Sequence, residues 1–132
     1  MFTLSKQTDY ALIIISQLRE ASDDFIPLSR LVDNTNLPQR FLARIAATLV
    51  THRILISREG RVGGYKLSQT VDTISLFDFL KIFESRLDFL QCEKRGYKCK
   101  FEKVCKHRHG VQEKLNAVVM KQLKATKLID LF

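Results

Sequence analysis

Apolar side chains recur every three or four residues in several stretches of the chain, which predicts amphipathic helices. The first helix is expected over residues 8–21, and a second, shorter helix over residues 27–32. Residues 33–36 (DNTN) are typical of a turn. The apolar stripe of the first helix is formed by Tyr10, Ile13, Ile14 and Leu18.

A third helix is expected from about Leu37, with Asn36 or a neighbour as its N-cap and Pro38 in its first turn. Its buried stripe is Leu42, Ile45 and Leu49, and its opposite face carries Gln39, Arg40, Ala43, Arg44 and Ala47. A short helix, a tight turn and a helix with a polar, basic face form the helix-turn-helix arrangement.

Two short β-prone runs follow the third helix. They cover residues 54–58 and 65–67, and a glycine-rich, basic turn over residues 59–64 separates them. This pattern predicts a hairpin whose glycines permit positive φ angles and close backbone approach. A hairpin directly after a helix-turn-helix is a wing.

The rest of the chain is predicted to contain two helices joined by an irregular stretch. The first covers residues 74–83, with Ser75 or Thr73 as its cap, and the last covers about residues 111–127. The stripe of the last helix is Val111, Leu115, Val118, Val119 and Leu123. Little chain remains to cover it, so a partner helix is expected.

The fold class is therefore mostly α: a winged helix-turn-helix with a two-stranded β wing, a cysteine loop and a long C-terminal dimerisation helix. The expected segments are a DNA-binding domain over residues 1–83, a cysteine-rich loop over 84–109 and a dimerisation helix over 110–132.

Charge points to a polyanionic partner. The 132 residues contain 22 Lys and Arg against 14 Asp and Glu, a formal charge of +8, and phosphate contacts release counterions. No apolar run approaches the length of a membrane span, and the N-terminus lacks the features of a secretory signal. A cytoplasmic protein without a membrane association is expected.

The candidate DNA-reading side chains are Gln39, Arg40 and Arg44, because amide and guanidinium groups pair bidentately with base edges in the major groove. Alone, such a face is more often the solvated side of an amphipathic helix. The adjacent wing favours DNA binding, because its cations can contact phosphates or the minor groove. Glu59, which lies among these cations, would repel phosphate. The wing candidates are Arg58, Arg61, Gly63, Gly64, Tyr65 and Lys66.

The three cysteines, Cys92, Cys99 and Cys105, all lie in the irregular stretch, surrounded by lysines and arginines. Thiolates favour iron–sulfur clusters or zinc, and structural zinc usually uses closer pairs. Cations lower a thiol's pKa and offset the charge of a cluster. Zinc, or three unrelated thiols, are the alternatives. A thiol redox enzyme is disfavoured because no C-x-x-C motif occurs.

Three cysteines leave a cluster one ligand short, and His107 and His109 are nearby candidates for that position.

Together these residues resemble the IscR/NsrR group of bacterial winged-helix regulators, the Rrf2 family. The matching segments are LSKQTDYAL (4–12), LVTHRILIS (49–57), GRVGGYKLS (60–68), ISLFDFLKIFE (74–84) and the three-cysteine loop. The ending LKATKLIDLF resembles the tail of regulators of the SUF cluster-assembly system, which is a weaker signal.

The resemblance implies a homodimer that is paired through the terminal helix and binds a roughly palindromic promoter site in double-stranded DNA. We therefore expect a transcription regulator, specifically a repressor, and not an enzyme. The resemblance also implies a [2Fe-2S] or [4Fe-4S] cluster that senses iron–sulfur status, redox state or nitric oxide. Some relatives use a histidine three residues after the third cysteine, but Arg108 holds that position here. Others use an acidic residue of the partner subunit, which corresponds to Asp9. Asp9 is favoured as the fourth ligand, with His107 second. Many relatives also have arginine where Glu59 stands, which shifts weight to Arg58 and Arg61.

Overall fold

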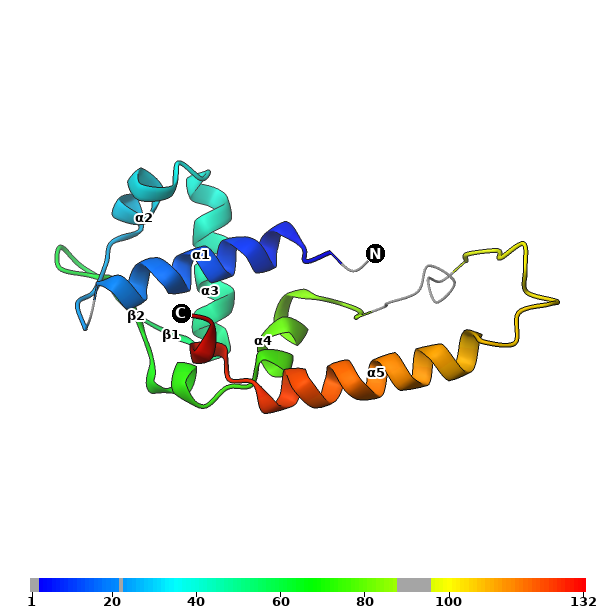
Figure 1. Ribbon diagram of the computed structural model, residues 1–132. Coiled ribbons are helices and arrows are strands. Elements are labelled where there is room, and N and C mark those ends of the chain that lie inside the picture. Colours follow the sequence, from blue (N-terminus) through cyan, green and yellow to red (C-terminus); the bar gives the residue numbers. More distant parts are fainter. Residues whose placement is uncertain (1–2, 22, 88–95) are drawn as a thin grey trace.

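The computed structural model describes residues 3–21, 23–87 and 96–132, and does not extend to the side chains of Arg108 and His109. In this part of the chain, helices dominate and one antiparallel pair of strands forms the sheet (Figure 1). This confirms the mostly α winged-helix class. The elements in order are α1 (Lys6–Glu20), α2 (Leu28–Thr35), α3 (Gln39–Thr51), β1 (Leu55–Arg58), β2 (Gly64–Leu67), η1 (Gln69–Asp72), α4 (Leu76–Phe83), α5 (Arg108–Ala125) and η3 (Leu128–Leu131).

Helix α1 begins two residues earlier than predicted because Ser5 caps it. The Ser5 hydroxyl accepts the backbone N–H of Thr8 at 3.3 Å and satisfies a donor that would otherwise be free. The predicted stripe was partly wrong, since Ile13 is 38% exposed. The buried face of α1 is instead Thr8, Ala11, Ile14, Ile15 and Leu18.

The turn between α2 and α3 is shorter than predicted. Helix α2 includes the first three residues of the expected turn and ends at Thr35, with Asn36 as its C-cap in a left-handed conformation (φ of 54°). Asn36 therefore closes α2 rather than capping α3, and Pro38, expected inside the first turn, is the residue before it. An asparagine suits this position because it tolerates the left-handed conformation. The predicted inner face of α3 is confirmed: Leu42, Ile45 and Leu49 are all buried.

The wing is a two-stranded hairpin that a third segment extends. Leu55 faces Leu67 and Arg58 faces Gly64 in the antiparallel register. The segment before α2 adds a bridge, because Ile26 and Tyr65 exchange two backbone hydrogen bonds of 2.9 Å. The wing is thereby fastened to the start of the helix-turn-helix, a link that the sequence analysis did not predict.

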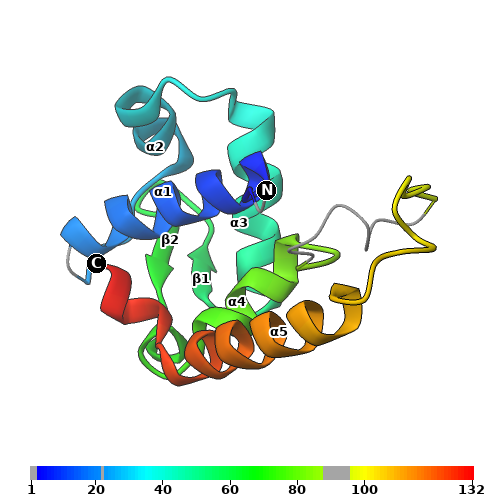
Figure 2. The same ribbon diagram turned by 45° about the vertical axis from the view of Figure 1, so that its right-hand side comes forward.

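The end of the chain returns to the winged domain. The Leu76 N–H donates to the Thr126 carbonyl at 2.8 Å, and the Leu128 N–H donates to Ile74 at 3.0 Å. Leu128 is fully buried in the same core as α1 and α3. In Figure 2, η3 lies beside the wing strands and α5 packs along α4. The proposed division into three segments therefore includes a last segment that closes the core of the first.

Helix α5 extends from the winged domain and carries residues 96–107 at its far end (Figure 1). Within the described part of the chain, no helix combines the length and apolarity required to cross a bilayer.

Candidate nucleic-acid interface and metal-binding loop

The outward face of α3 carries the three side chains that were predicted from the sequence to contact bases. Gln39, Arg40 and Arg44 are all exposed. The helix, QRFLARIAATLVT, contains neither Asp nor Glu, so none of its own side chains would repel a phosphate. An exposed helix with amide and guanidinium groups can dock in a major groove.

Phe41 is a member of this surface that the sequence analysis missed. Its side chain is 51% exposed, although phenylalanine is usually among the more buried residues. The Arg44 guanidinium carbon lies 6.0 Å from the centre of its ring, within cation–π range. In the sequence, the available signal was an aromatic residue between Arg40 and Arg44, outside the apolar stripe of the helix.

Arg58, predicted to contact DNA, is engaged within the wing. Its guanidinium carbon lies 4.0 Å from the centre of the Phe25 ring, and its Nη2 donates to the Val62 carbonyl at 2.5 Å. The Lys66 ammonium lies 5.2 Å from the same ring. Cations from both strands thus contact one aromatic side chain, which holds the hairpin tip in place. DNA contacts by Arg58 and Lys66 remain predictions.

Gly63 and Gly64 allow close packing inside the wing. A Cβ atom on Gly63 would lie 2.2 Å from the Arg58 carbonyl oxygen, and one on Gly64 would lie 2.2 Å from that of Ile26. Gly64 also has a φ of +137°. Both positions therefore require glycine for steric reasons, whatever their part in DNA binding. Tyr65 is half-buried beside them, whereas Arg61 is exposed.

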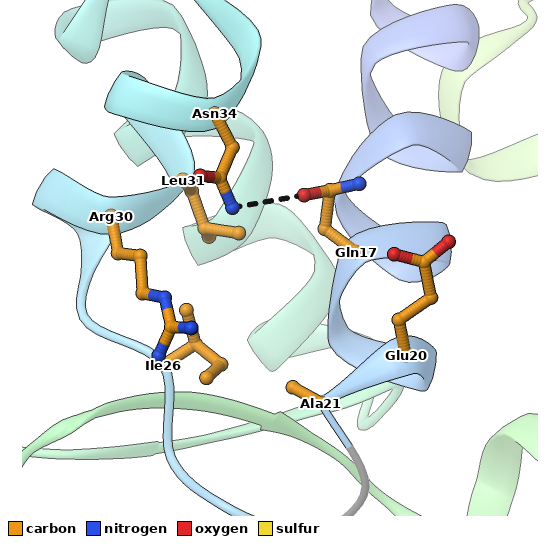
Figure 3. Close-up of a pocket in the computed structure, with 7 residues that line it drawn as sticks. All are labelled: Gln17, Glu20, Ala21, Ile26, Arg30, Leu31 and Asn34. Atoms are coloured by element: carbon orange, nitrogen blue, oxygen red, sulfur yellow. Dashed lines mark hydrogen bonds between the residues drawn. The ribbon is translucent and has the colours of Figure 1, made fainter.

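The basic surface continues from the wing to α2. A hollow of about 460 Å³ beside the wing is lined in part by Arg30, Arg58 and Arg61. Arg30 also lines a hollow of about 230 Å³ between the end of α1 and α2, where Asn34 donates to the Gln17 side chain at 3.0 Å (Figure 3). Asp24 also lines the first hollow, but its three arginines leave an excess of positive charge there, which suits contacts with the phosphate backbone.

The cysteine loop is described for two of its three thiols. Cys99 and Cys105 are half-buried free thiols, whereas Cys92 lies outside the described residues. The Cys105 sulfur lies 3.7 Å from Nδ1 of His107, which precedes α5. The exposed cations of this segment are Lys98, Lys100, Lys103 and Lys106.

Asp9, the other candidate ligand, is exposed near the start of α1. Both ribbon views place that end of the helix apart from residues 96–107 (Figures 1 and 2). Among the side chains that the structure describes, no three potential ligands converge on a metal position.

Glu84 ties the start of the irregular stretch to α1. Its Oε1 accepts the Ser5 N–H at 2.7 Å and the Thr8 hydroxyl at 2.5 Å. Burial by itself would raise the pKa of Glu84, but the hydrogen bonds from Thr8 and Ser5 outweigh it and lower that pKa below its usual value.

The apolar stripe of α5 divides into two faces. Leu123 packs toward the core, so the single stripe predicted from the sequence was wrong in this part. Val111, Leu115 and Val118 remain 37%, 39% and 66% exposed. Their spacing of four and three residues places them on one side of the helix.

The donor chemistry of the loop fits an iron–sulfur cluster. The described sulfurs are thiols that no disulfide engages, and the lysines around them offset the negative charge that thiolates and sulfides introduce.

The helix-turn-helix, the tethered wing and the exposed basic face of α3 define a winged-helix DNA-binding protein. The chain belongs to the Rrf2 family of iron-dependent transcriptional regulators, whose family model matches residues 4–132. Its fold and family are those of transcription regulators and not of enzymes.

Relatives agree with this assignment. A protein of Aquifex aeolicus (strain VF5) that is named as an HTH-type transcriptional regulator is 25% identical over 124 residues, covering 92% of this chain and 85% of its own. Among solved structures, the fold is similar to CymR, titled the global cysteine regulator of B. subtilis, with a TM-score of 0.73 and 22% identity over 99% of this chain and 96% of that one.

The fold is also similar to the IscR of T. potens, with a TM-score of 0.64 and 20% identity over 98% of this chain and 85% of that one. At these identities, the structural similarities establish the fold.

Proposed function

We propose that this protein is a homodimeric transcriptional repressor whose operator affinity is controlled by an iron–sulfur cluster. The observation that carries the DNA-binding part is the exposed, acid-free face of α3 beside a wing that Ile26 and Phe25 hold in place. A family described as iron-dependent supports the metal-controlled part. Such a regulator acts in the cytoplasm, on the DNA that it controls.

Cys92, Cys99 and Cys105 would hold the cluster, with Asp9 of a second subunit as the favoured fourth ligand and His107 as the alternative. Bound there, a [2Fe-2S] or [4Fe-4S] cluster would supply redox chemistry and sensitivity to iron supply or nitric oxide. The lysines of the loop support this assignment, because they lower the cost of gathering negative charge.

The loop is placed to influence how the recognition helices are held. The loop connects Glu84 with α5. Glu84 accepts a hydrogen bond from Thr8 of α1, and α5 carries the exposed apolar face. A change in the loop would therefore alter the dimer contact. The spacing of the two α3 helices must match two half-sites, so a dimer rearrangement changes operator affinity.

The test is anaerobic purification followed by an absorption spectrum and quantification of iron and sulfide. A coloured protein containing both elements is expected, and Cys99→Ala should lose that absorption. Duplex binding is then measured with holo and apo protein at one salt concentration. A colourless protein containing zinc would favour a constitutive DNA-binding protein, and equal holo and apo affinities would rule out the switch.

A further inference from the structure

The exposed aromatic ring on α3 has no structural task that accounts for its position. Phe41 is 51% exposed, and the core beneath α3 is completed by other residues, including Leu42 and Leu49, which are fully buried. Leaving a ring half in water forgoes the stabilisation that its burial would give. A partner that covers the ring would recover that stabilisation.

The chemistry around the ring identifies that partner as double-stranded DNA. Arg40 and Arg44, both exposed, flank Phe41 in the sequence, and the Arg44 guanidinium lies 6.0 Å from the ring. An exposed aromatic ring with a guanidinium beside it suits the major groove, where the thymine methyl is the apolar group presented beside hydrogen-bonding edges.

We propose that Phe41 is a specificity-determining residue that reads the C5-methyl group of a thymine in the operator. Arg44 lies beside it and reads the guanine of a neighbouring base pair, its guanidinium oriented by the contact with the ring. This proposal rests on the proposed DNA binding by α3. It adds a sequence preference that the arginines cannot supply, because a guanidinium gains nothing from a methyl group.

The experiment uses the full chain and a duplex obtained by in vitro selection from a random library. Each thymine of that duplex is replaced in turn by deoxyuridine, which removes the C5-methyl group and leaves base pairing intact. At the thymine that Phe41 reads, this replacement removes one buried methyl group from each half-site. The affinity should fall by about fourfold for each half-site that is changed. Phe41→Ala should bind both duplexes equally at that position.

Two matched variants separate reading from general effects. Phe41→Leu keeps an apolar side chain and should retain a preference for thymine over uracil. Val62→Ala shortens another exposed apolar side chain, 75% exposed in the wing, and should leave the preference at the wild-type value. Thermal denaturation checks the fold of Phe41→Ala, whose truncation removes little buried surface.

The outcomes separate this proposal from the one on which it rests. Selection that yields no preferred sequence would overturn specific DNA binding itself. A preferred sequence in which no deoxyuridine weakens the wild-type protein, or in which Phe41→Ala shows the wild-type ratio, would overturn methyl reading alone. An equal loss on thymine and uracil duplexes would assign Phe41 to the sugar–phosphate backbone instead.

Discussion

The Thr8 hydroxyl donates a 2.5 Å hydrogen bond to Glu84, and so joins the first helix to the residue at which the cysteine-bearing stretch begins. Thr8 is fully buried, and the same carboxylate oxygen accepts the Ser5 N–H at 2.7 Å. Asp9, the proposed ligand, directly follows Thr8. Contacts at the base of the loop and a candidate ligand thus occupy one short segment of α1.

Glu84→Gln should destabilise the protein at neutral pH and reduce the dependence of its stability on acid. The amide keeps an acceptor but loses the charge, which costs about 1 kcal/mol of unfolding free energy. Because hydrogen bonds lower the pKa of Glu84 in the folded state, the stabilisation is complete above the unfolded pKa of about 4.3. It is lost as the pH falls through the lower, folded value.

Urea unfolding at a series of pH values tests this. The difference between wild type and Glu84→Gln should be constant above about pH 5 and shrink toward zero below the unfolded pKa. Glu59→Gln, at an exposed position in the wing, is the matched control and should follow the wild-type curve. A difference that persists unchanged in acid would mean that the charge of Glu84 contributes nothing.

The helices and the wing could be predicted because local signals specify them. Leu42, Ile45 and Leu49 repeat at helical spacing, and they are buried as expected. The boundaries were less certain because tertiary contacts set them. Asn36 closes α2 by adopting a left-handed conformation, which the sequence permits without requiring.

The sequence predicted which residues form the candidate site better than it predicted which of them contact one another. The arginines of α3 were found because they share one face, whereas the interaction of Arg58 with Phe25 joins residues 33 positions apart in the sequence. The bridge between Ile26 and Tyr65 joins residues that are 39 positions apart. Such pairings depend on the packing of the whole domain, and the local spacing of apolar residues along the sequence does not indicate them.

Arg44→Ala should weaken binding to the selected operator by about 1–3 kcal/mol, because it removes a bidentate donor. Arg44→Lys keeps the charge without the paired geometry, so it should lose most of the sequence preference and retain much of the binding to unrelated DNA. Fluorescence anisotropy with specific and scrambled duplexes measures both. Unchanged affinity of the alanine variant would show that Arg44 does not contact a base and that this face of α3 is only a solvated surface.

Gly64→Ala should destabilise the protein by about 3 kcal/mol or more, because strain at positive φ adds to a clash with the Ile26 carbonyl. Gly60 is the matched control. Its φ is also positive, at 102°, but nothing lies within 4 Å of an added Cβ. Gly60→Ala should therefore cost only about 1–2 kcal/mol, the strain alone. Equal losses, measured by urea unfolding, would contradict close packing at the bridge.

Leu115→Glu should convert the protein to a monomer, since it places a charge in the exposed apolar face of α5. Light scattering should give twice the chain mass of 15.3 kDa for the wild type and that mass for the variant. Glu113→Gln, at an exposed position outside the stripe, is the control and should remain dimeric. A dimeric Leu115→Glu protein would assign subunit pairing to another surface.

Mixed dimers decide which subunit supplies the fourth ligand. Asp9→Ala should lose its cluster, as should a variant in which all three cysteines are alanine. If Asp9 serves the site of its partner, a mixed dimer joins intact cysteines on one subunit with an intact Asp9 on the other. Random pairing of equal amounts should then restore about a quarter of the wild-type sites, since half of the dimers are mixed and each has one complete site. Co-unfolding and refolding before anaerobic reconstitution allows the subunits to exchange, and iron and sulfide quantification measures the recovered clusters.

No recovery would place Asp9 in the same subunit as the cysteines that it serves. A stable cluster in Asp9→Ala, combined with its loss in His107→Ala, would instead identify His107, whose ring nitrogen already lies 3.7 Å from the Cys105 sulfur.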